Sequence, residues 1–349
     1  RWSRGLGDVY KRQTLTDDAL LSASRDNVVA AVAGGDAAIG IAWLDLSAGR
    51  FRLTEVADLE SLRAEIARLN PAEIVVDEDQ AFADSFDGSM RVTHRPPWHF
   101  EHDSAKRLLC AQFGTRDLVG FGCEELACGV AAAGALLQYV TDTQKAALPH
   151  LQSIGVELEK DAIVMDAPTR RNLELEESLS GHDEHTLAGI MDRCQTAMGS
   201  RLLRRWIQRP LRDATTLKAR YQALDAMLSS GAVEALQERL HGIGDVERIL
   251  ARVALRSARP RDLRQLGEAL SRLPGLLEHL ATIESPLLNA LVERIGEHRQ
   301  QRRLLASAIV DSPPMLIREG GVIAPGYDEE LDDLRAVAQN ADQYLIDLE

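Results

Sequence analysis

The chain has 349 residues, a length that suggests two domains and part of a third. Hydrophobic residues make up 45% and charged residues 27%, which excludes a disordered or fibrous chain, and no apolar run reaches the ~20 residues of a membrane helix. A formal net charge of −14 excludes a surface that neutralises phosphate groups unaided, because such a surface carries an excess of Lys and Arg. We therefore expect a globular protein without membrane contact and with little DNA affinity of its own.

The first segment of the chain, residues 1–13, has neither a helical nor a strand period. It resembles translated adapter sequence, so we treat it as a non-native leader and residues 14–26 as a linker. Its Gly5 and Gly7 do not form a nucleotide-binding loop, because no strand precedes them and a third glycine is missing.

Residues 27–141 have a mixed α/β pattern. Apolar and β-branched runs separated by glycine turns predict strands at 28–32, 38–46, 50–56, 73–76 and 90–93. Helical spacing predicts helices at 58–69, 103–113 and 124–140. If the first of these helices is a crossover, the strand that follows it runs parallel to the strand before it.

Residues 142–165 are predicted to be a linker with short extended stretches, and almost everything after Asp166 is predicted to be helical. Prolines at 210, 260, 274, 286 and 313–314 are expected to interrupt or end helices in this part. The predicted helices cover residues 168–177, 186–208, 213–229, 245–256, 260–272 and 287–310.

The last segment has apolar residues spaced alternately four and three apart, which predicts a heptad seam that needs a partner helix. These residues are Tyr327, Leu331, Leu334, Ala338, Ala341, Leu345 and Leu348. No glycine cap follows, so we expect the helix to continue beyond Glu349. The alternative is an ordinary terminal helix that lies on the core.

The four cysteines, at positions 110, 123, 128 and 194, show no CxxC pairing. Cys123 and Cys128 are wrongly spaced for a zinc knuckle. We expect free thiols in a reducing cytoplasm, with a disulfide or a metal role as the alternative.

Two stretches, Arg170–Gly181 and Thr186–Asp213, carry a resemblance to a known family. They are similar to the opening of the core domain of the MutS family of DNA mismatch-repair proteins. The matching residues are Arg171, Asn172, Leu173, Glu174, Asp192, Thr196, Met198, Gly199, Arg201, Leu202, Leu203, Trp206, Pro210, Leu211 and Asp213. Met191 stands where the family usually has leucine, a change that conserves volume. Residues 113–122, 137–151, 245–263 and 318–335 also resemble proteobacterial members, so the resemblance covers 14–349.

The resemblance implies an α/β connector domain, ribonuclease H-like, at 27–141, followed by a mostly α-helical core and lever domain at 166–343. Residues 344–349 would begin the lever that leads to a clamp domain outside this chain. The whole protein would bind mismatched double-stranded DNA as a homodimeric clamp, use ATP and magnesium, and contact a MutL-type partner. This part, probed alone, would be monomeric and would couple the ATPase to the clamp, since a packed helical lever moves by rigid rearrangement.

Arginines occur at helical spacing in two places. Arg204 and Arg205 lie on a predicted helix with one apolar side formed by residues 202, 203, 206 and 207, and we expect these arginines to form ion pairs between helices. Arg248, Arg252 and Arg256 lie four residues apart, which predicts either a phosphate-contacting stripe or a structural network. Acidic residues at 247 and 262 are interleaved with them and favour the network.

Two alternatives outside the family remain open on the sequence. One is a metal nuclease, in which Asp45 would act with Glu73, Asp77 or Glu78, although Asp45 precedes a tight turn that commonly needs an aspartate. The other is an unrelated helical scaffold.

Histidines suggest a metal site only weakly. His182 and His185 lie just before a predicted helix, and their acidic neighbours at 183 and 184 are of the type that the positive N-terminal end of a helix stabilises. The histidines at 94, 99 and 102 flank two prolines. Neither GxxxxGK[ST] nor GxSxG occurs anywhere in the chain. We therefore assign no catalytic, cofactor-binding or metal-binding residue.

Overall fold

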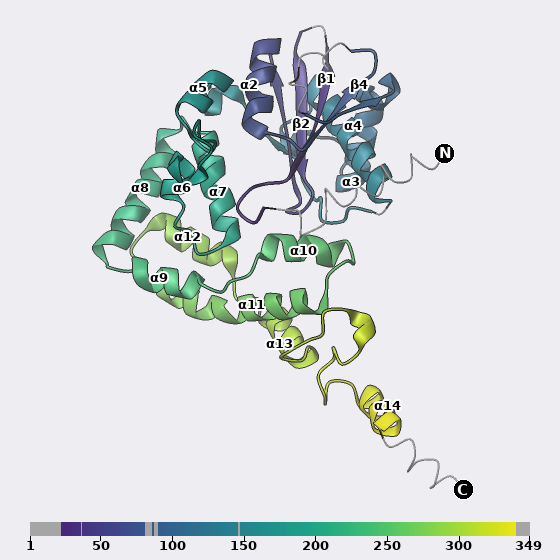
Figure 1. Cartoon of the computed structure of the whole chain (residues 1–349), viewed down its shortest axis with the longest axis vertical. Helices are drawn as coiled ribbons and strands as arrows, with labels where there is room; N and C mark the ends of the chain where they lie inside the picture. The colour runs from purple at the N-terminus through teal and green to yellow at the C-terminus, as the bar shows by residue number, and fades with distance from the viewer. Residues whose placement is uncertain (1–21, 36, 81–85, 87–89, 146, 340–349) are drawn as a thin grey trace.

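In the computed structural model the described residues are 22–35, 37–80, 86, 90–145 and 147–339. A sheet with its covering helices, the sheet region, ends near residue 156, and a chain of helices, the helical region, follows from residue 167 (Figure 1). The predicted leader at 1–13, and the linker before residue 22, lie outside the described residues. No described helix is both long enough and apolar enough to cross a membrane.

The described strands form a six-stranded mixed sheet in the order β5-β4-β1-β2-β3-β6. Their bounds are β1 Val28–Gly34, β2 Ile39–Asp45, β3 Arg50–Val56, β4 Glu73–Asp77, β5 Val92–Arg95 and β6 Gly155–Val156. β2 is antiparallel to both of its neighbours, whereas β4 pairs parallel with β1, β5 with β4, and β6 with β3. β4 therefore runs in the same direction as β3, as the crossover predicted, but its partner in the sheet is β1.

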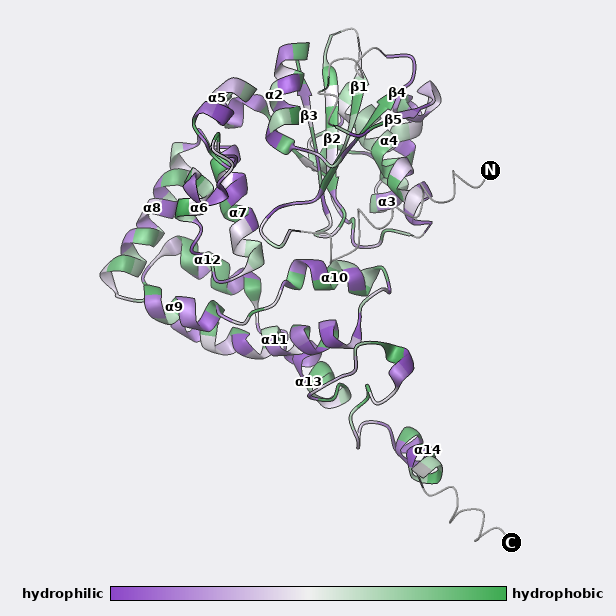
Figure 2. Ribbon diagram, in the orientation of Figure 1, coloured by the Kyte–Doolittle hydropathy of each residue, from purple (hydrophilic) through white to green (hydrophobic). Residues whose placement is uncertain are grey.

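Alternating side chains of the strands build a separate apolar core on each face of the sheet. Helix α2 (Leu59–Leu69) covers the face of Ile41 and Trp43, and contributes Leu62. Helices α3 (His102–Phe113) and α4 (Ala127–Gln144) cover the other face. The strands and α4 are accordingly the most apolar part of the ribbon (Figure 2).

Helix α4 lies unusually close to β2 at Gly40. A Cβ atom at this position would lie 2.0 Å from the backbone carbon of Cys128, so no larger residue fits without displacing the helix. The predicted extended stretch of the 142–165 segment is the short edge strand β6, and Leu148, Leu151 and Ile154 before it are buried in the α4-side core.

Ten α-helices lie in the described part of the helical region. They are α5 Ala167–Asn172, α6 Leu187–Met191, α7 Ala197–Gln208, α8 Ala214–Ser229, α9 Val233–Leu240, α10 Val246–Ala254, α11 Pro260–Ala281, α12 Pro286–Ile295, α13 Arg299–Ala308 and α14 Glu329–Gln339. Their apolar core is small and joins α8, α9, α11 and α12 through residues such as Ala223, Leu236 and Leu276. In Figure 1 the helices pass from α5 beside α2 down through α8 and α9, and return along α11.

The single helix predicted at 186–208 is wrong, because the chain breaks between α6 and α7. The Asp192 carboxylate accepts hydrogen bonds from the Ser200 hydroxyl (2.9 Å) and the Cys194 amide (3.3 Å). The Thr196 hydroxyl then accepts from the Gly199 amide (3.1 Å) and caps α7. Side chains that bond to the backbone in this way favour a helix start over a helix interior.

Three other predicted helices differ from the structure. The helix predicted at 287–310 is two helices, α12 and α13, because Gly296 (φ 65°) and His298 (φ 47°) adopt positive φ values. The helix predicted to end at residue 272 continues through Pro274 to Ala281, and α9 was not predicted. The helix predicted at 168–177 ends at Asn172, and Glu174 (φ 45°) turns the chain. In contrast, the helix predicted at 213–229 is confirmed as α8.

Helix α14 extends away from the other helices (Figure 1). Its seam residues Tyr327 and Leu334 are exposed, so this part of the heptad face does not lie on the described core. The seam residues at 341, 345 and 348 lie outside the described residues.

Candidate functional site: a charged junction between sheet and helices

Helix α7 and its C-cap residue carry three arginines at a spacing of four, Arg201, Arg205 and the C-cap Arg209, which we call the α7 arginine face. The spacing of four residues places them above one another on the helix surface. Each binds a carboxylate from another part of the chain.

Arg201 is the buried centre of this junction, and its side chain has no exposed surface. Its two Nη groups donate to both oxygens of Asp245 at 2.7 Å, a bidentate pair, and Nη2 also donates to Glu247 at 2.7 Å. Nη1 donates in addition to the backbone carbonyl of Ala23 at 3.0 Å. Burial alone would lower the pKa of Arg201, but these two carboxylates outweigh burial and raise it, so the guanidinium stays charged.

Asp245 serves two elements at once. Its side chain accepts a hydrogen bond from the Arg248 amide and caps the start of α10. Burial alone would raise the pKa of this carboxyl, but the hydrogen bonds and charge of Arg201 outweigh burial and lower it. Asp245 is therefore ionised whenever the junction is intact at neutral pH.

The segment that leads into β1, Ser22–Asn27, is held against α7 and α10, and we call it the strap. The buried Arg248 donates to the strap carbonyls of Ser22 (2.8 Å) and Arg25 (3.1 Å), and Arg201 binds the carbonyl between them. These bonds hold the strap by its backbone.

Asp26 is the strap carboxylate that links the two regions. It accepts from Arg205 of α7 at 2.9 and 3.1 Å and from Arg50 of β3 at 2.8 Å. Asp45 lies nearby at the end of β2 and is buried; burial, and then the negative charge of Asp26, raise the pKa of Asp45.

Glu157, just after β6, forms a second link of the same kind. It binds Arg209 of α7 at 3.2 Å and the buried Arg68 of α2 at 3.0 Å. Arg209 also donates to the carbonyl of Leu158 at 2.6 Å. Asp26 and Glu157 are thus each shared between an arginine of the sheet region and one of the α7 arginine face, and Arg201 Nε also lies 3.9 Å from Asp26.

Several residues of the matching stretches have visible structural roles. Pro210 and Leu211 contact the segment before α5, through the Ile163 amide (2.9 Å) and a bridge to Ala162. Asp213 caps α8 through the amides of residues 215 and 216. Arg171, Asn172 and the neighbouring Leu173 are exposed at the end of α5, and Met198 and Leu203 are half-buried.

Glu174 and Gly199 have roles in the local backbone conformation, one at a turn and the other at the start of α7. The Glu174 carboxylate accepts from the Leu179 amide at 2.6 Å and closes the turn that its positive φ begins. Gly199 lies above the α7 cap, where a Cβ would come within 3.1 Å of the Thr196 hydroxyl.

The prediction that one side of α7 is buried by apolar residues is wrong in part. Leu202 and Trp206 are each 42% exposed. Arg220 of α8 lies over the Trp206 ring, 3.7 Å from its centroid. The adjacent arginines do form ion pairs, but not between two helices as predicted: Arg204 binds Asp192, just after α6, at 3.3 Å, and Arg205 binds Asp26 of the strap.

The predicted stripe does not form one exposed face. Arg248 is buried against the strap, and Arg252 binds Asp262 at 2.7 Å. Arg256 lies beyond the end of α10, exposed, with a φ of 55°. This geometry favours the structural network over phosphate contact.

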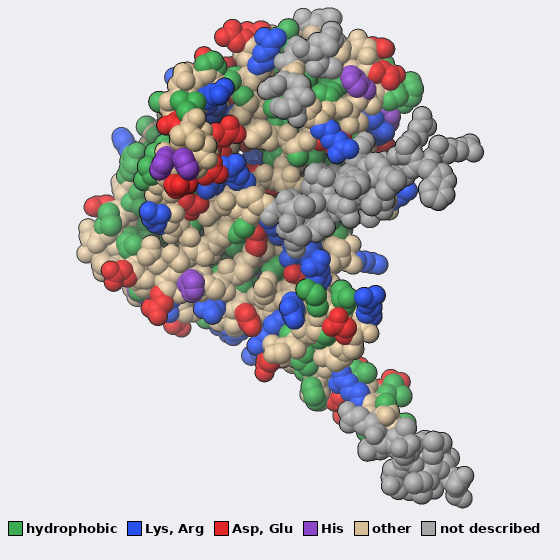
Figure 3. All heavy atoms as spheres, in the orientation of Figure 1, with side chains coloured by type: hydrophobic (Ala, Val, Ile, Leu, Met, Phe, Trp, Pro, Cys, Tyr) green, Lys and Arg blue, Asp and Glu red, His purple; other side chains and the backbone are tan. Residues whose placement is uncertain are grey.

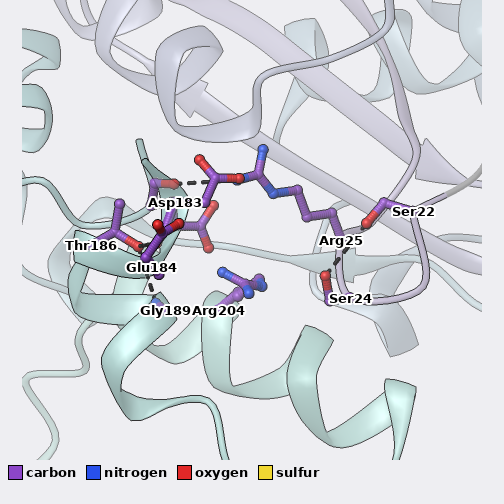
Figure 4. A pocket seen from close by; sticks show the side chains of 9 residues that line it. Ser22, Ser24, Arg25, Asp183, Glu184, Thr186, Gly189 and Arg204 are labelled. Atoms are coloured by element: carbon purple, nitrogen blue, oxygen red, sulfur yellow. Dashed lines mark hydrogen bonds and ion pairs between the residues drawn. The ribbon is translucent and has the colours of Figure 1, made fainter. Parts of the chain in front are cut away.

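A cavity of about 360 Å³ lies beside the junction, between the strap, the start of α6 and α7 (Figure 4). Arg25 binds Asp183 at its edge, 3.2 Å away, and Arg204 also lines it. Burial raises the pKa of Glu176, another lining residue. The mixed signs and the lack of a nucleophile with an adjacent base give this cavity no evident chemistry.

The metal hypotheses find no support in the geometry. Asp45 belongs to the α2-side face of the sheet, whereas Glu73 lies on the α4 side, where it accepts from the Tyr139 hydroxyl at 2.7 Å. Asp77 shares the Glu73 face but lies at the opposite end of β4, so these carboxylates do not converge as a metal nuclease requires. The Asp45 carboxylate instead accepts from Ser47 and from the Ala48 amide, the predicted turn role.

The paired histidines likewise remain without further ligands. The rings of His182 and His185 lie 5.4 Å apart, and Asp183 between them binds Arg25. Within the described residues no group of three or more His, Cys, Asp or Glu side chains is arranged to hold a metal. None of the four cysteines takes part in a disulfide bond in the described part of the chain.

Sequence reasoning missed Asp26, Glu157, Arg209 and Asp245 as members of one site. Asp26 and Glu157 lie in segments that were read as linkers, and nothing in their sequence marks them. The i, i+4, i+8 spacing of the α7 arginines was the available signal, and Asp245 stands where a helix cap is expected.

Comparison with known families agrees with this arrangement of a sheet region and a helical region. Residues 27–152 match MutS domain II, and residues 168–349 match MutS domain III. The domain III match alone covers more than half of the 349 residues. The chain therefore belongs to the MutS family.

Proposed function

We propose that this protein acts in DNA mismatch repair as part of a clamp protein that binds mismatched double-stranded DNA. The observation that carries the proposal is the match to two consecutive MutS domains, whose arginines share the carboxylates of Asp26 and Glu157. Membership of the family excludes an unrelated helical scaffold.

In this proposal the sheet region is a connector domain and the helical region is a core with the beginning of a lever. A mostly parallel sheet with one antiparallel strand and helices on both faces is compatible with a ribonuclease H-like connector. The junction supports a coupling role, because paired charges with fixed partners rearrange between discrete states. Movement of α7 would thereby reach the sheet through Asp26 and Glu157.

ATP and magnesium would be used by the whole protein, but the residues of this chain do not fit them. The GxxxxGK[ST] loop that cradles phosphates is absent from the sequence, and the cavity beside the junction is lined by Glu176, Asp183 and Glu184 as well as arginines. We therefore propose that this chain performs no catalysis. Its partners would be mismatched DNA and a MutL-type protein, with homodimerisation through parts outside it.

The test is complementation. A MutS protein in which domains II and III are replaced by residues 22–349 of this chain, expressed in a bacterial strain that lacks mismatch repair, is expected to lower the frequency of spontaneous resistance mutations. A variant with Arg201→Met should lose much of that effect, whereas Arg264→Met, which removes pairs with the exposed Glu268 and Asp311, should retain it. An unchanged mutation frequency, with soluble protein detected in the cells, would contradict the proposed function.

A further inference from the structure

The contacts between α7 and the sheet region are mainly ionic. Of the three apolar core clusters, two belong to the sheet region and one to the helices; among the described residues after 167, Leu255, which follows α10, is the one packed against a sheet cluster. Regions that lack a large apolar interface are free to change their relative orientation. The angle between them then depends on the polar contacts that remain.

Two of these contacts have the same construction. Arg205 and Arg209, one helical turn apart, each bind a carboxylate that also binds an arginine of the sheet region. At the strap, Asp26 lies between Arg205 and Arg50; after β6, Glu157 lies between Arg209 and Arg68.

In each link one carboxylate lies between a guanidinium group of the sheet region and one of the α7 arginine face; Arg201 Nε also lies 3.9 Å from Asp26, and Arg68 also binds Glu65 at 2.7 Å. The charges are close enough to interact, since the positive charge of Arg205 contributes to lowering the pKa of Arg50 while Asp26 acts to raise it. Neutralising the shared carboxylate therefore removes two attractions and leaves two like charges facing each other. The side chains of both carboxylates are mostly buried, which limits screening by salt.

We propose that Asp26 and Glu157 are a two-point hinge that fixes the angle of α7 against the sheet. Each carboxylate joins one point of α7 to the sheet region in addition to the strap bond of Arg201, and loss of either lets α7 swing about the contacts that remain. The use of the hinge in coupling rests on the proposed function. The hinge itself follows from the ion pairs of this chain.

The experiment measures the distance distribution between two spin labels in the full chain, without DNA or nucleotide. The labels are attached to a keto-bearing unnatural amino acid placed at Arg63 of α2 and at Gln222 of α8, both exposed. Helix α8 reports on α7 because Arg220 lies on the Trp206 ring. Native cysteines stay in place, since the label does not react with thiols.

Asp26→Asn and Glu157→Gln are each expected to broaden the distribution and shift its mean, and the double variant to broaden it further. The matched control is Asp183→Asn, which removes the exposed partner of Arg25 on the same strap and should leave the distribution unchanged. Arg205→Lys keeps the charge but loses the two-bond geometry, so it should give an intermediate width even if Asp26→Asn does not fold.

Distributions for Arg205→Lys and Glu157→Gln that superimpose on the native one, with native helical content by circular dichroism, would overturn the hinge. This outcome is separate from the complementation test, because the distances require neither DNA repair nor ATP. A chain that complements but shows unchanged distances would keep the proposed function and lose the hinge.

Discussion

Arg201 shows how one residue can tie together segments that are far apart in the sequence. Its guanidinium binds the strap carbonyl of Ala23 and the carboxylates of Asp245 and Glu247, so it contacts the start of the sheet region and α10 from α7. Its position within the matching stretch Thr186–Asp213 agrees with this role. A buried charge of this kind stabilises the fold only while all its partners remain.

Arg201→Met is expected to lower the free energy of unfolding by about 3 kcal/mol, because two carboxylates lose their partner in a partly buried site. Urea unfolding followed by circular dichroism measures this. The control is Arg264→Met, on a pair with the exposed Asp311, which should cost less than about 1 kcal/mol. Equal losses in the two variants would show that burial of Arg201 has no special effect.

Asp45→Asn is expected to stabilise the protein at pH 7. Burial and Asp26 raise the pKa of Asp45 in the folded state, so its ionised form opposes folding above that pKa, and protonation relieves the penalty as the pH falls. Asparagine keeps an oxygen to accept from Ser47 and carries no charge. The advantage of the variant should shrink as the pH falls through the folded pKa and vanish below about 3.9, the unfolded value.

Urea unfolding of both proteins between pH 3.5 and pH 7, an interval chosen around that unfolded value of about 3.9, measures the difference. A constant difference across this interval would mean that Asp45 does not titrate as its burial requires. A variant less stable than the native chain at pH 7 would mean that the ionised Asp45 is held by the positive charge of Arg50 or Arg248.

At the scale of elements, the helix starts and ends were decided by side chains that bond to the backbone. Thr196 and Asp213 cap the helices that follow them, and Gly296 ends α12. The opposite case is α11, which continues through Pro274 although proline removes a backbone hydrogen bond and strains the preceding turn. Burial of Leu276 and Leu277 just beyond it offsets that cost.

Pro274→Ala is therefore expected to raise the free energy of unfolding by about 1–3 kcal/mol, since alanine restores the missing hydrogen bond. Pro260→Ala provides the matched control, because Pro260 occupies the first position of α11, where proline is well tolerated, and should bring no gain. Thermal unfolding of the two variants and the native chain compares them. A higher free energy of unfolding in both variants, or in neither, would contradict the conclusion that Pro274 destabilises α11.

For the whole molecule, the acidic balance separates this chain from a free-standing DNA-binding protein. On the face seen in Figure 3, Lys and Arg side chains are interspersed with Asp and Glu. Many described arginines, among them Arg201, Arg205 and Arg252, are engaged in internal ion pairs. Fewer arginines are thus available to bind phosphate groups than the net charge of −14 alone suggests.

Fluorescence anisotropy with a G·T mismatch duplex and its matched control, at ~0.1 M salt, is expected to show weak binding without preference for the mismatch. The chain would then depend on other parts of its protein to read DNA. Tight, mismatch-selective binding would instead assign DNA contact to this chain, with the exposed Arg256 as the first residue to replace.

How far the sequence predicted the structure depended on the kind of element. The strands β1 to β4 and helix α8 lie close to their predicted positions, because alternating and 3.6-residue apolar patterns reflect local burial. The break at residues 192–196 and the continuation through Pro274 were missed, since local capping and distant packing competed with the period. Of the junction, Arg201, Arg205 and Arg248 were singled out, but not their partners.

The sequence by itself determined the family, the order of a sheet region before a helical region, and the net charge, all of which follow from residue identity and local spacing. Only the tertiary structure decided that Asp26 and Glu157 share arginines across the two regions, and that Asp45 and Glu73 lie on opposite faces. These pairings join residues far apart in the chain. Their energies depend on burial and on distances between charges, which a linear pattern does not contain.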